Sequence, residues 1–238
     1  AIVLAPASIQ ESVDLTYEAF DLAEKYRAIT VILIDGSIGQ MMEPAEMPPM
    51  RPLKTQYPDW AVRGILEHPA ERRVLSSIYL DPPDEEVANL RMLRRWQQVE
   101  ANEVRYKGFF CEDARFVVVG FGSAGRVALS AVRAARAEGI PVGLLRPITL
   151  KPFPAKALDE LSRQVEGMLV VEMNSGQMLE DVRRVVGGRV PVEFYGRLGG
   201  IIPMPDEILE EIRRLTGEPL ALDGHPRDRW LARMPRSN

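Results

Sequence analysis

Short apolar runs alternate with amphipathic segments most regularly between Phe116 and Gly217. The runs are rich in β-branched residues and predict strands, while apolar residues at three- and four-residue spacing predict helices. The predicted strands are 116–120, 139–145, 168–172 and 190–195, and the predicted helices follow them at 124–135, 154–165, 177–186 and 205–215. Strands and helices that alternate in this way predict an open, mostly parallel α/β sheet with right-handed crossovers.

A second α/β pattern occupies the start of the chain. Apolar runs at 2–4 and 29–34 predict strands, and the helix between them begins with a Ser-x-x-Glu capping box at Ser8 and Glu11. Parallel sheets are normally covered on both faces, which two strands and one helix cannot achieve. The first residue is also not methionine. We therefore expect residues 1–44 to be the C-terminal remnant of a larger α/β domain, completed by missing chain or by a partner.

Between these patterns the composition changes. Residues 45–110 begin with many prolines, which predict a linker, and continue into a long helix that starts near Asp84 and stops at Gly108. Its apolar stripe is narrow, so the helix either crosses a domain or subunit surface or is a solvated surface helix. Residues 111–217 then form the regular α/β domain, and 218–238 form a polar tail that we expect to be irregular.

Composition narrows the function classes. With 238 residues and 46% hydrophobic content the chain can bury a real core. A net charge of −4, with acids and bases interspersed, provides no basic field for nucleic acid and no polybasic segment for a membrane surface. No apolar stretch is long enough to cross a bilayer, and Ala1 to Leu4 do not make a signal peptide. We therefore expect this chain to bind neither nucleic acid nor a membrane, and we expect a cytoplasmic location.

Cysteine and histidine, the sulfur and nitrogen ligands of metal ions, are rare in this chain. Cys111 is the only cysteine, so these residues cannot form an internal disulfide or hold a cysteine-ligated iron–sulfur cluster alone. His68 and His225 are far apart, and each precedes a proline. We expect both to be loop residues, and we assign no metal site.

The segment from Gly120 to Gly125 reads G-x-G-x-x-G between a strand and a helix, as in dinucleotide-binding sites. The N-terminus of such a helix can bind a phosphate or carboxylate, but the same glycines also permit a tight turn with close packing. The acid expected about twenty residues later is replaced by Arg146. Arginine suits a 2′-phosphate, so an NADP site remains an alternative to the packing role.

Two further predicted strands end in polar residues, at 172–177 and 195–200. Glu172 could be a general base, an ion-pair partner of a neighbouring chain, or a cap of the next helix. No catalytic residue is assigned. The candidates for an interface or an anion site are Gly122, Ser123, Arg126, Glu172, Asn174, Gln177 and Arg197. Of these we expect four to contact another domain or subunit: Arg126, Glu172, Gln177 and Arg197.

Four long motifs carry a family resemblance. They are Gly122-Ser123-Ala124-Gly125-Arg126, 142–154, 171–178 and 194–197. In sequence, order and spacing they resemble the α subunit of 2-oxoacid:ferredoxin oxidoreductases, as do 8–26, 35–44 and 100–106. The run Gly-Gln-Met-Met-Glu-Pro at 39–44 looks closest to the branched-chain (2-oxoisovalerate) members.

This resemblance implies a pyrimidine-binding domain for residues 1–44 and a transketolase-C-terminal-like domain for 111–217. The implied enzyme oxidatively decarboxylates a 2-oxoacid to acyl-CoA. It uses thiamine diphosphate with Mg, shared with a partner subunit, and coenzyme A as substrate, and an iron–sulfur cluster on a partner subunit passes electrons to ferredoxin. The implied partners are β and γ/δ subunits.

The family's thiamine-activating glutamate would lie in an N-terminal portion outside this chain, so it maps to no residue here. We therefore expect the chain alone to be inactive and to serve as scaffold and interface. The alternatives are an NADP-binding oxidoreductase domain and a non-catalytic interaction module.

Overall fold

The computed structural model describes residues 1–52, 58, 60–62, 75–220 and 222–235. These form two compact units. The first joins Ala1–Glu46 to Val99–Asn238, and the second is Met47–Gln98. The first unit is therefore discontinuous in sequence. The proposed border between residues 1–44 and 111–217 inside this unit stays a prediction.

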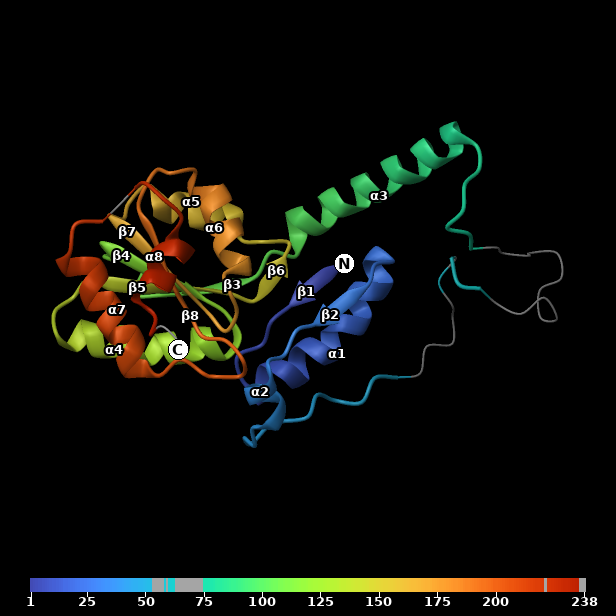
Figure 1. The fold of residues 1–238 in the computed structure, drawn as a ribbon. Coiled ribbons are helices and arrows are strands. Elements are labelled where there is room, and N and C mark those ends of the chain that lie inside the picture. Colours follow the sequence, from blue (N-terminus) through green and yellow to red (C-terminus); the bar gives the residue numbers. More distant parts are fainter. Residues whose placement is uncertain (53–57, 59, 63–74, 221, 236–238) are drawn as a thin grey trace, which may run out of the picture. The chain divides into compact units, whose positions relative to one another are not determined.

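The larger sheet of the first unit has five strands in the order β3-β5-β4-β7-β8 (Figure 1). The strands are β3 (Tyr106–Phe109), β4 (Phe116–Gly120), β5 (Val142–Pro147), β7 (Gly167–Glu172) and β8 (Val192–Gly196). All neighbours pair in parallel except β3, which lies antiparallel to β5 at the edge. The expected open, mostly parallel α/β sheet is confirmed.

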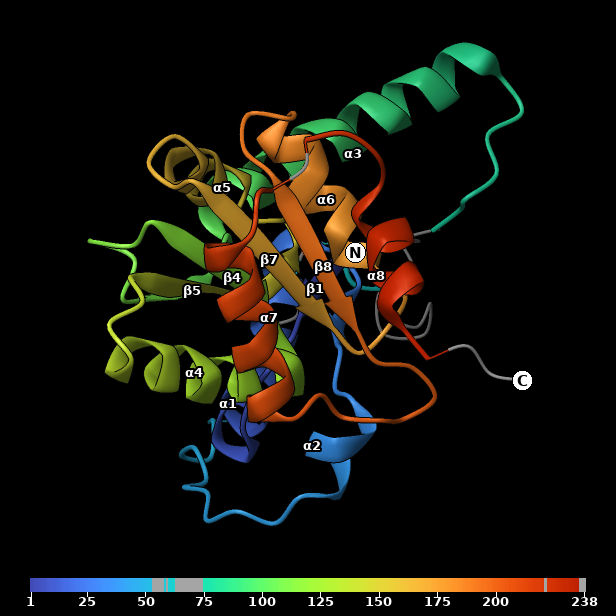
Figure 2. The same ribbon diagram turned by 60° about the vertical axis from the view of Figure 1, so that its left-hand side comes forward.

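Helices cover both faces of this sheet. They are α4 (Gly122–Ala137), α5 (Ala155–Ser162), α6 (Gln177–Val186) and α7 (Pro205–Gly217). Helix α4 packs with α7 and α5 packs with α6, so the sheet lies between two pairs (Figure 2). The chain moves from β4 to β5 in one direction and from β7 to β8 in the other. The strand order therefore reverses between β4 and β7, the position where open α/β sheets usually bind ligands.

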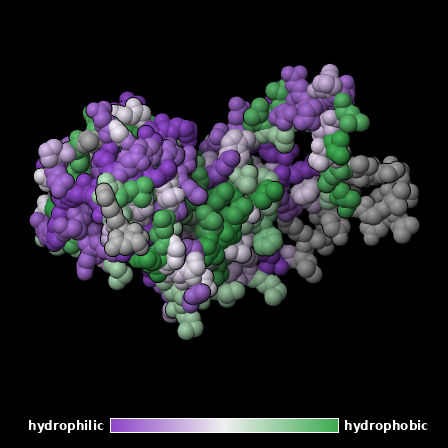
Figure 3. Space-filling view, in the orientation of Figure 1, coloured by the Kyte–Doolittle hydropathy of each residue, from purple (hydrophilic) through white to green (hydrophobic). Residues whose placement is uncertain are grey.

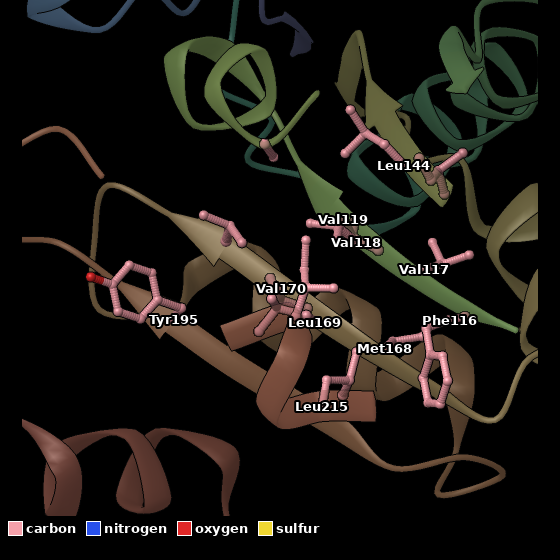
Figure 4. Close-up of a cluster of buried hydrophobic side chains, with 14 of the residues drawn as sticks. Phe116, Val117, Val118, Val119, Leu144, Met168, Leu169, Val170, Tyr195 and Leu215 are labelled. Carbon is pink, nitrogen blue, oxygen red and sulfur yellow. The ribbon is translucent and has the colours of Figure 1, made fainter. Parts of the chain in front are cut away.

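The hydrophobic core lies along the central strands (Figure 4). Every residue of β4, β5, β7 and β8 is buried. Strands covered on both faces need continuous apolar runs rather than alternation, which explains the pattern Phe-Val-Val-Val of β4. Each fully buried Val or Leu side chain stabilises the fold by about 1.5–3 kcal/mol.

A second sheet of three strands has the order β2-β1-β6. Its strands are β1 (Ile2–Leu4), β2 (Thr30–Ile32) and β6 (Thr149–Lys151). Strands β1 and β2 are parallel and connected through α1 (Ile9–Tyr26), as the sequence predicted, and β2 leads into the short α2 (Gly36–Gln40). Strand β6 was not predicted. It pairs antiparallel with β1 and so joins the N-terminal segment to the rest of the unit.

The outer strand β2 is only partly covered by the described residues. Its neighbours Ile29, Leu33 and Ile34 are exposed, as is Val31 within it. Figure 3 shows hydrophobic side chains gathered over β1 and β2. The expectation that this βαβ unit needs further protein stays a prediction.

The long helix ends earlier than predicted. Helix α3 spans Pro82–Asn102, whereas we expected it to continue to Gly108. Residues 106–109 instead form β3, whose register runs from Tyr106 opposite Pro147 to Phe109 opposite Leu144. Pairing with the exposed edge of β5 supplies backbone hydrogen bonds that local helix signals do not reveal.

The prediction that the tail at 218–238 is irregular is also wrong, because α8 (Pro226–Arg233) forms there. His225 precedes it in the loop, as expected, and caps it by accepting a hydrogen bond from the Arg227 amide. Trp230 is buried and packs edge-on against Phe194, with 5.2 Å between ring centroids. Trp230 therefore anchors α8 to β8, together with the ion pair between Arg229 and Glu193. His68, the other expected loop histidine, lies outside the described residues.

Candidate functional site

The N-terminus of α4, which follows the glycine turn, is occupied by a carboxylate of the chain itself. Asp35 accepts hydrogen bonds from the Ser123 amide at 2.9 Å and from the Ser123 hydroxyl at 2.8 Å. The same carboxylate caps α2 by accepting from the amides of Ser37 and Ile38. It lies where a phosphate would bind in a dinucleotide site. The helix N-terminus that we expected to bind an anion thus binds the Asp35 carboxylate of the same chain.

The glycines of this turn permit close approach. A Cβ atom on Gly125 would come within 2.5 Å of the Gly120 carbonyl oxygen. Gly122 has φ +55°, and a Cβ there would lie 2.9 Å from the Asp35 carboxylate. The packing role expected for the G-x-G-x-x-G pattern is the one the structure shows.

Arg146, the residue that kept an NADP site open, is buried in an internal ion pair. Its two terminal nitrogens donate to the two carboxylate oxygens of Glu11 at 2.9 and 2.6 Å, and Lys107 donates to the same group at 2.7 Å. Burial tends to raise the pKa of Glu11, but the hydrogen bonds from Arg146 and Lys107 outweigh burial and lower this pKa to about 2. Arg146 therefore holds the N-terminal segment and does not face an open ribose site.

Arg126 makes a third connection to the N-terminal segment. Its guanidinium pairs with Glu43, and it donates to the Ala7 carbonyl at 3.4 Å. Glu43 also accepts from the Ile9 amide at 3.1 Å. The hydrogen bond from Arg126 holds the pKa of Glu43 below its ordinary value. Three of the candidates therefore contact residues 1–46. They are Gly122, Ser123 and Arg126.

Glu172 is the cap of α6. It is completely buried at the end of β7 and accepts hydrogen bonds from the amides of Met178 at 2.9 Å and Leu179 at 2.8 Å. Burial raises the pKa of Glu172, although these amide hydrogen bonds oppose the shift. The side-chain oxygen of Asn174 accepts hydrogen bonds from the two preceding amides, those of Gly176 and Gln177. Of the three roles considered for Glu172, the structure shows the helix cap.

Arg197 lies in the loop directly after β8, and its amide donates a hydrogen bond to the Glu172 carbonyl oxygen at 3.1 Å. It pairs with Glu207 in the first turn of α7. Burial, together with the charge of Glu207, raises the pKa of the neighbouring Tyr195 to about 12. Gln177 is exposed at the start of α6. The candidate residues therefore occupy two places, one at the start of α4 and one at the ends of β7 and β8. Contacts of Gln177 and Arg197 with another subunit stay predictions.

Asp35 and Glu11 were not among the candidates. The sequence offered only weak signals, because Asp-Gly at 35–36 marks the end of a strand and Glu11 belongs to a capping box. Among the described residues, no group of three or more His, Cys, Asp or Glu side chains could hold a metal ion. In the same part of the chain, no helix is both long and apolar enough to cross a membrane.

Two family models match the chain in order. Residues 1–72 match "Pyruvate flavodoxin/ferredoxin oxidoreductase, thiamine diP-bdg", and residues 114–208 match "Pyruvate:ferredoxin oxidoreductase core domain II". The first match covers β1 to α2, and the second begins just before β4. The matched regions are thus the ones that Asp35 and Ser123 hold together.

Curated relatives and a solved structure agree with these matches. The chain is 45% identical over 217 residues to the ketoisovalerate oxidoreductase subunit VorB of Methanothermobacter thermautotrophicus, covering 91% of this chain and 61% of the relative. It is 32% identical to the 2-oxoglutarate synthase subunit KorA of Methanothermobacter marburgensis, covering 89% of this chain and 63% of the relative. The fold is similar to that of the 2-oxoglutarate:ferredoxin oxidoreductase from Magnetococcus marinus, with TM-score 0.70 at 19% identity, covering 90% of this chain and 42% of that one. This chain therefore spans less than two thirds of these relatives, and it belongs to the 2-oxoacid:ferredoxin oxidoreductase family.

Proposed function

We propose that this chain is part of the α subunit of a thiamine-diphosphate-dependent 2-oxoacid:ferredoxin oxidoreductase, of the branched-chain type. Such an enzyme oxidatively decarboxylates a 2-oxoacid to acyl-CoA and passes electrons to ferredoxin. The observation that carries the proposal is the pair of family domains in chain order, joined through Asp35 and Ser123. The 45% identity to a ketoisovalerate oxidoreductase subunit supports the branched-chain type.

In this proposal the described residues act as scaffold and interface, not as the catalytic centre. The helix N-termini beside the strand reversal are both filled, that of α4 by Asp35 and that of α6 by Glu172. A diphosphate therefore has no free helix terminus there. The single cysteine does not fit a resident cysteine-ligated iron–sulfur cluster. We assign the thiamine diphosphate with Mg to a site shared with a partner, and the iron–sulfur cluster to a partner subunit.

We further propose that residues 1–44 belong to a pyrimidine-binding domain and residues 111–217 to a transketolase-C-terminal-like domain, with a linker at 45–110 and a C-terminal tail at 218–238. The exposed apolar face of β2, with Val31 and its neighbours, supports this division because it requires cover from more of the same domain. The match of residues 1–72 to a thiamine-diphosphate-binding family model supports it as well.

The proposed partners are β and γ/δ subunits, with ferredoxin as electron acceptor and coenzyme A as substrate. The relatives are named as subunits, which supports an assembly of several chains. The proposed location is the cytoplasm, where the unpaired thiol of Cys111 suits a reducing compartment.

The test is purification of the natural gene product under anaerobic conditions. We expect an intact mass above that of these 238 residues, co-purification with a thiamine-binding subunit, and 2-oxoacid-dependent reduction of ferredoxin. Activity should be higher with 2-oxoisovalerate than with 2-oxoglutarate. Purification without a thiamine-binding partner, or a stabilising thermal shift on adding NADP, would contradict the proposal and favour the NADP alternative.

A further inference from the structure

A pocket of about 520 Å³ lies between the last turn of α3, the residues that follow it, and the start of α5. Its apolar wall consists of Val104, Tyr106 and Phe153. Val104 and Tyr106 are 37% and 46% exposed, so part of this wall faces solvent. All the lining residues belong to the first unit. The volume lies within the range of about 300–1,000 Å³ that is usual for small-molecule sites.

Three charged side chains line the same pocket. Lys156 and Glu160 are one turn apart on α5 and therefore share one face of this helix, and Glu100 lines the pocket from α3. Among the described residues, the side chains of Lys156 and Glu160 have no ion-pair partner, whereas Asp159 on the same helix pairs with two arginines. An unpaired ammonium group and an unpaired carboxylate thus lie beside one apolar wall.

We propose that this pocket binds a free α-amino acid with an apolar side chain. The ammonium group of Lys156 donates to the α-carboxylate of the ligand. The carboxylates of Glu160 and Glu100 accept from its α-ammonium group, and its side chain packs against the apolar wall. This inference goes beyond the proposed function and does not depend on it.

Charge complementarity selects this class of ligand. A carboxylic acid without an amino group would bring an anion close to two carboxylates, and an amine without a carboxylate would leave Lys156 unpaired. A free amino acid has both charges on one carbon atom, so it can reach two side chains whose Cβ atoms are about 5–6 Å apart. Hydrogen bonds between charged groups are also about twice as strong as those between neutral groups.

The test is a titration of the whole chain with L-leucine, followed by saturation-transfer NMR of the ligand. We expect saturable binding with a Kd on the order of 1 mM. Glycine has the same two charges but no apolar side chain, so it should bind more weakly by roughly tenfold or more. D-Leucine should also bind more weakly, because it cannot satisfy both charges and the apolar wall together.

Two analogues of leucine assign the two charges. Isoamylamine lacks the carboxylate and isocaproate lacks the ammonium group, and each should bind roughly tenfold more weakly than leucine. Lys156→Met should weaken the binding of leucine but not of isoamylamine. Glu160→Gln should weaken the binding of leucine but not of isocaproate. The matched controls Arg133→Met and Glu112→Gln, at exposed positions outside the pocket, should leave leucine binding unchanged.

A blocking variant locates the ligand. Ala101 lines the pocket from an exposed position of α3, so Ala101→Phe should fill the space and abolish leucine binding. Thermal unfolding of each variant shows that it is folded. The proposal is overturned if leucine gives no saturable signal up to roughly 10 mM, or if neither Lys156→Met nor Glu160→Gln weakens its binding. Equal binding of leucine and isoamylamine would also overturn it and would indicate a site for amines.

Discussion

The carboxylate of Asp35 binds both the amide and the hydroxyl of Ser123, which lies 88 residues later in the chain. This pair joins the two regions that match separate family models. A helix N-terminus that usually receives a ligand thus receives a side chain from another part of the same unit.

Asp35→Ala should destabilise the first unit by about 2–3 kcal/mol, because it removes the caps of both α2 and α4. Ser123→Ala removes only the hydroxyl contact and should cost about 1 kcal/mol. Urea unfolding followed by circular dichroism measures both. The control is Asp14→Ala, an exposed acid on α1, which should change stability by less than about 0.5 kcal/mol. Equal effects of Asp35→Ala and Asp14→Ala would contradict the capping role.

The ion pair of Glu11 with Arg146 predicts an acid-dependent stability. The pKa of Glu11, about 2, lies below the ordinary 4.5, so the Glu11 carboxylate binds a proton more weakly in the folded state than in the unfolded state. The contribution is fully present above about pH 4.5 and is lost as the pH falls toward 2, and it is on the order of 3 kcal/mol. In Glu11→Gln, urea midpoints between pH 5 and 2 should depend less on pH. The exposed control Glu112→Gln should keep the original dependence.

Glu172 should be needed for stability and not as a base. Glu172→Ala leaves two buried amides of α6 without acceptors and should destabilise by about 2–4 kcal/mol. Glu172→Gln keeps one acceptor oxygen and should cost less. Because the pKa of Glu172 is raised in the folded state, ionisation of this carboxyl lowers the stability of the original chain as the pH rises through that pKa. The Glu172→Gln variant should lack this loss of stability. Thermal unfolding against pH measures this, with Glu160→Ala as exposed control. In the assembled enzyme, Glu172→Gln should keep its turnover, and abolished turnover in a folded variant would restore the general-base hypothesis.

Helix α8 should stabilise the edge of the large sheet. Glu193 is buried on β8 and pairs with Arg214 of α7 and with Arg229 of α8. Removing residues 225–238 would leave this carboxylate with fewer partners and would expose Phe194. Trp230→Ala alone should cost about 3–5 kcal/mol in urea unfolding. Leu231→Ala, at an exposed position of the same helix, should be nearly neutral, and a similar loss in both variants would contradict the anchoring role of Trp230.

The sequence was sufficient to predict the helices and strands whose apolar residues follow a local pattern along the chain. Strand β4 with its Phe-Val-Val-Val run, and α6 from Gln177 to Val186, were located by local periodicity alone. Strand β3 was missed because its formation depends on pairing with β5. Helix α8 was missed because it is anchored by contacts with β8, those of Trp230 with Phe194 and of Arg229 with Glu193. Both depend on residues distant in sequence.

The candidate site shows the same limit. The sequence located the turn at Gly122 and the end of β7 at Glu172, but it could not show what occupies each helix N-terminus. Asp35 reaches its site from a separate segment, and no local spacing relates it to Ser123. Glu172, by contrast, caps the helix that directly follows it, so this role was among those considered from sequence.

The pairing of β1 with β6 sets an order of events during synthesis. Val3 meets Lys151 only after about 150 further residues are made, which at roughly 5–20 residues per second takes roughly 7–30 s. Ribosome-bound chains that end at residue 140 should therefore leave residues 1–46 open to protease, whereas the released whole chain should protect them. Until β6 emerges, the apolar strand β1 lacks its antiparallel neighbour, so the edge of β1 that β6 later covers stays unpaired during this interval.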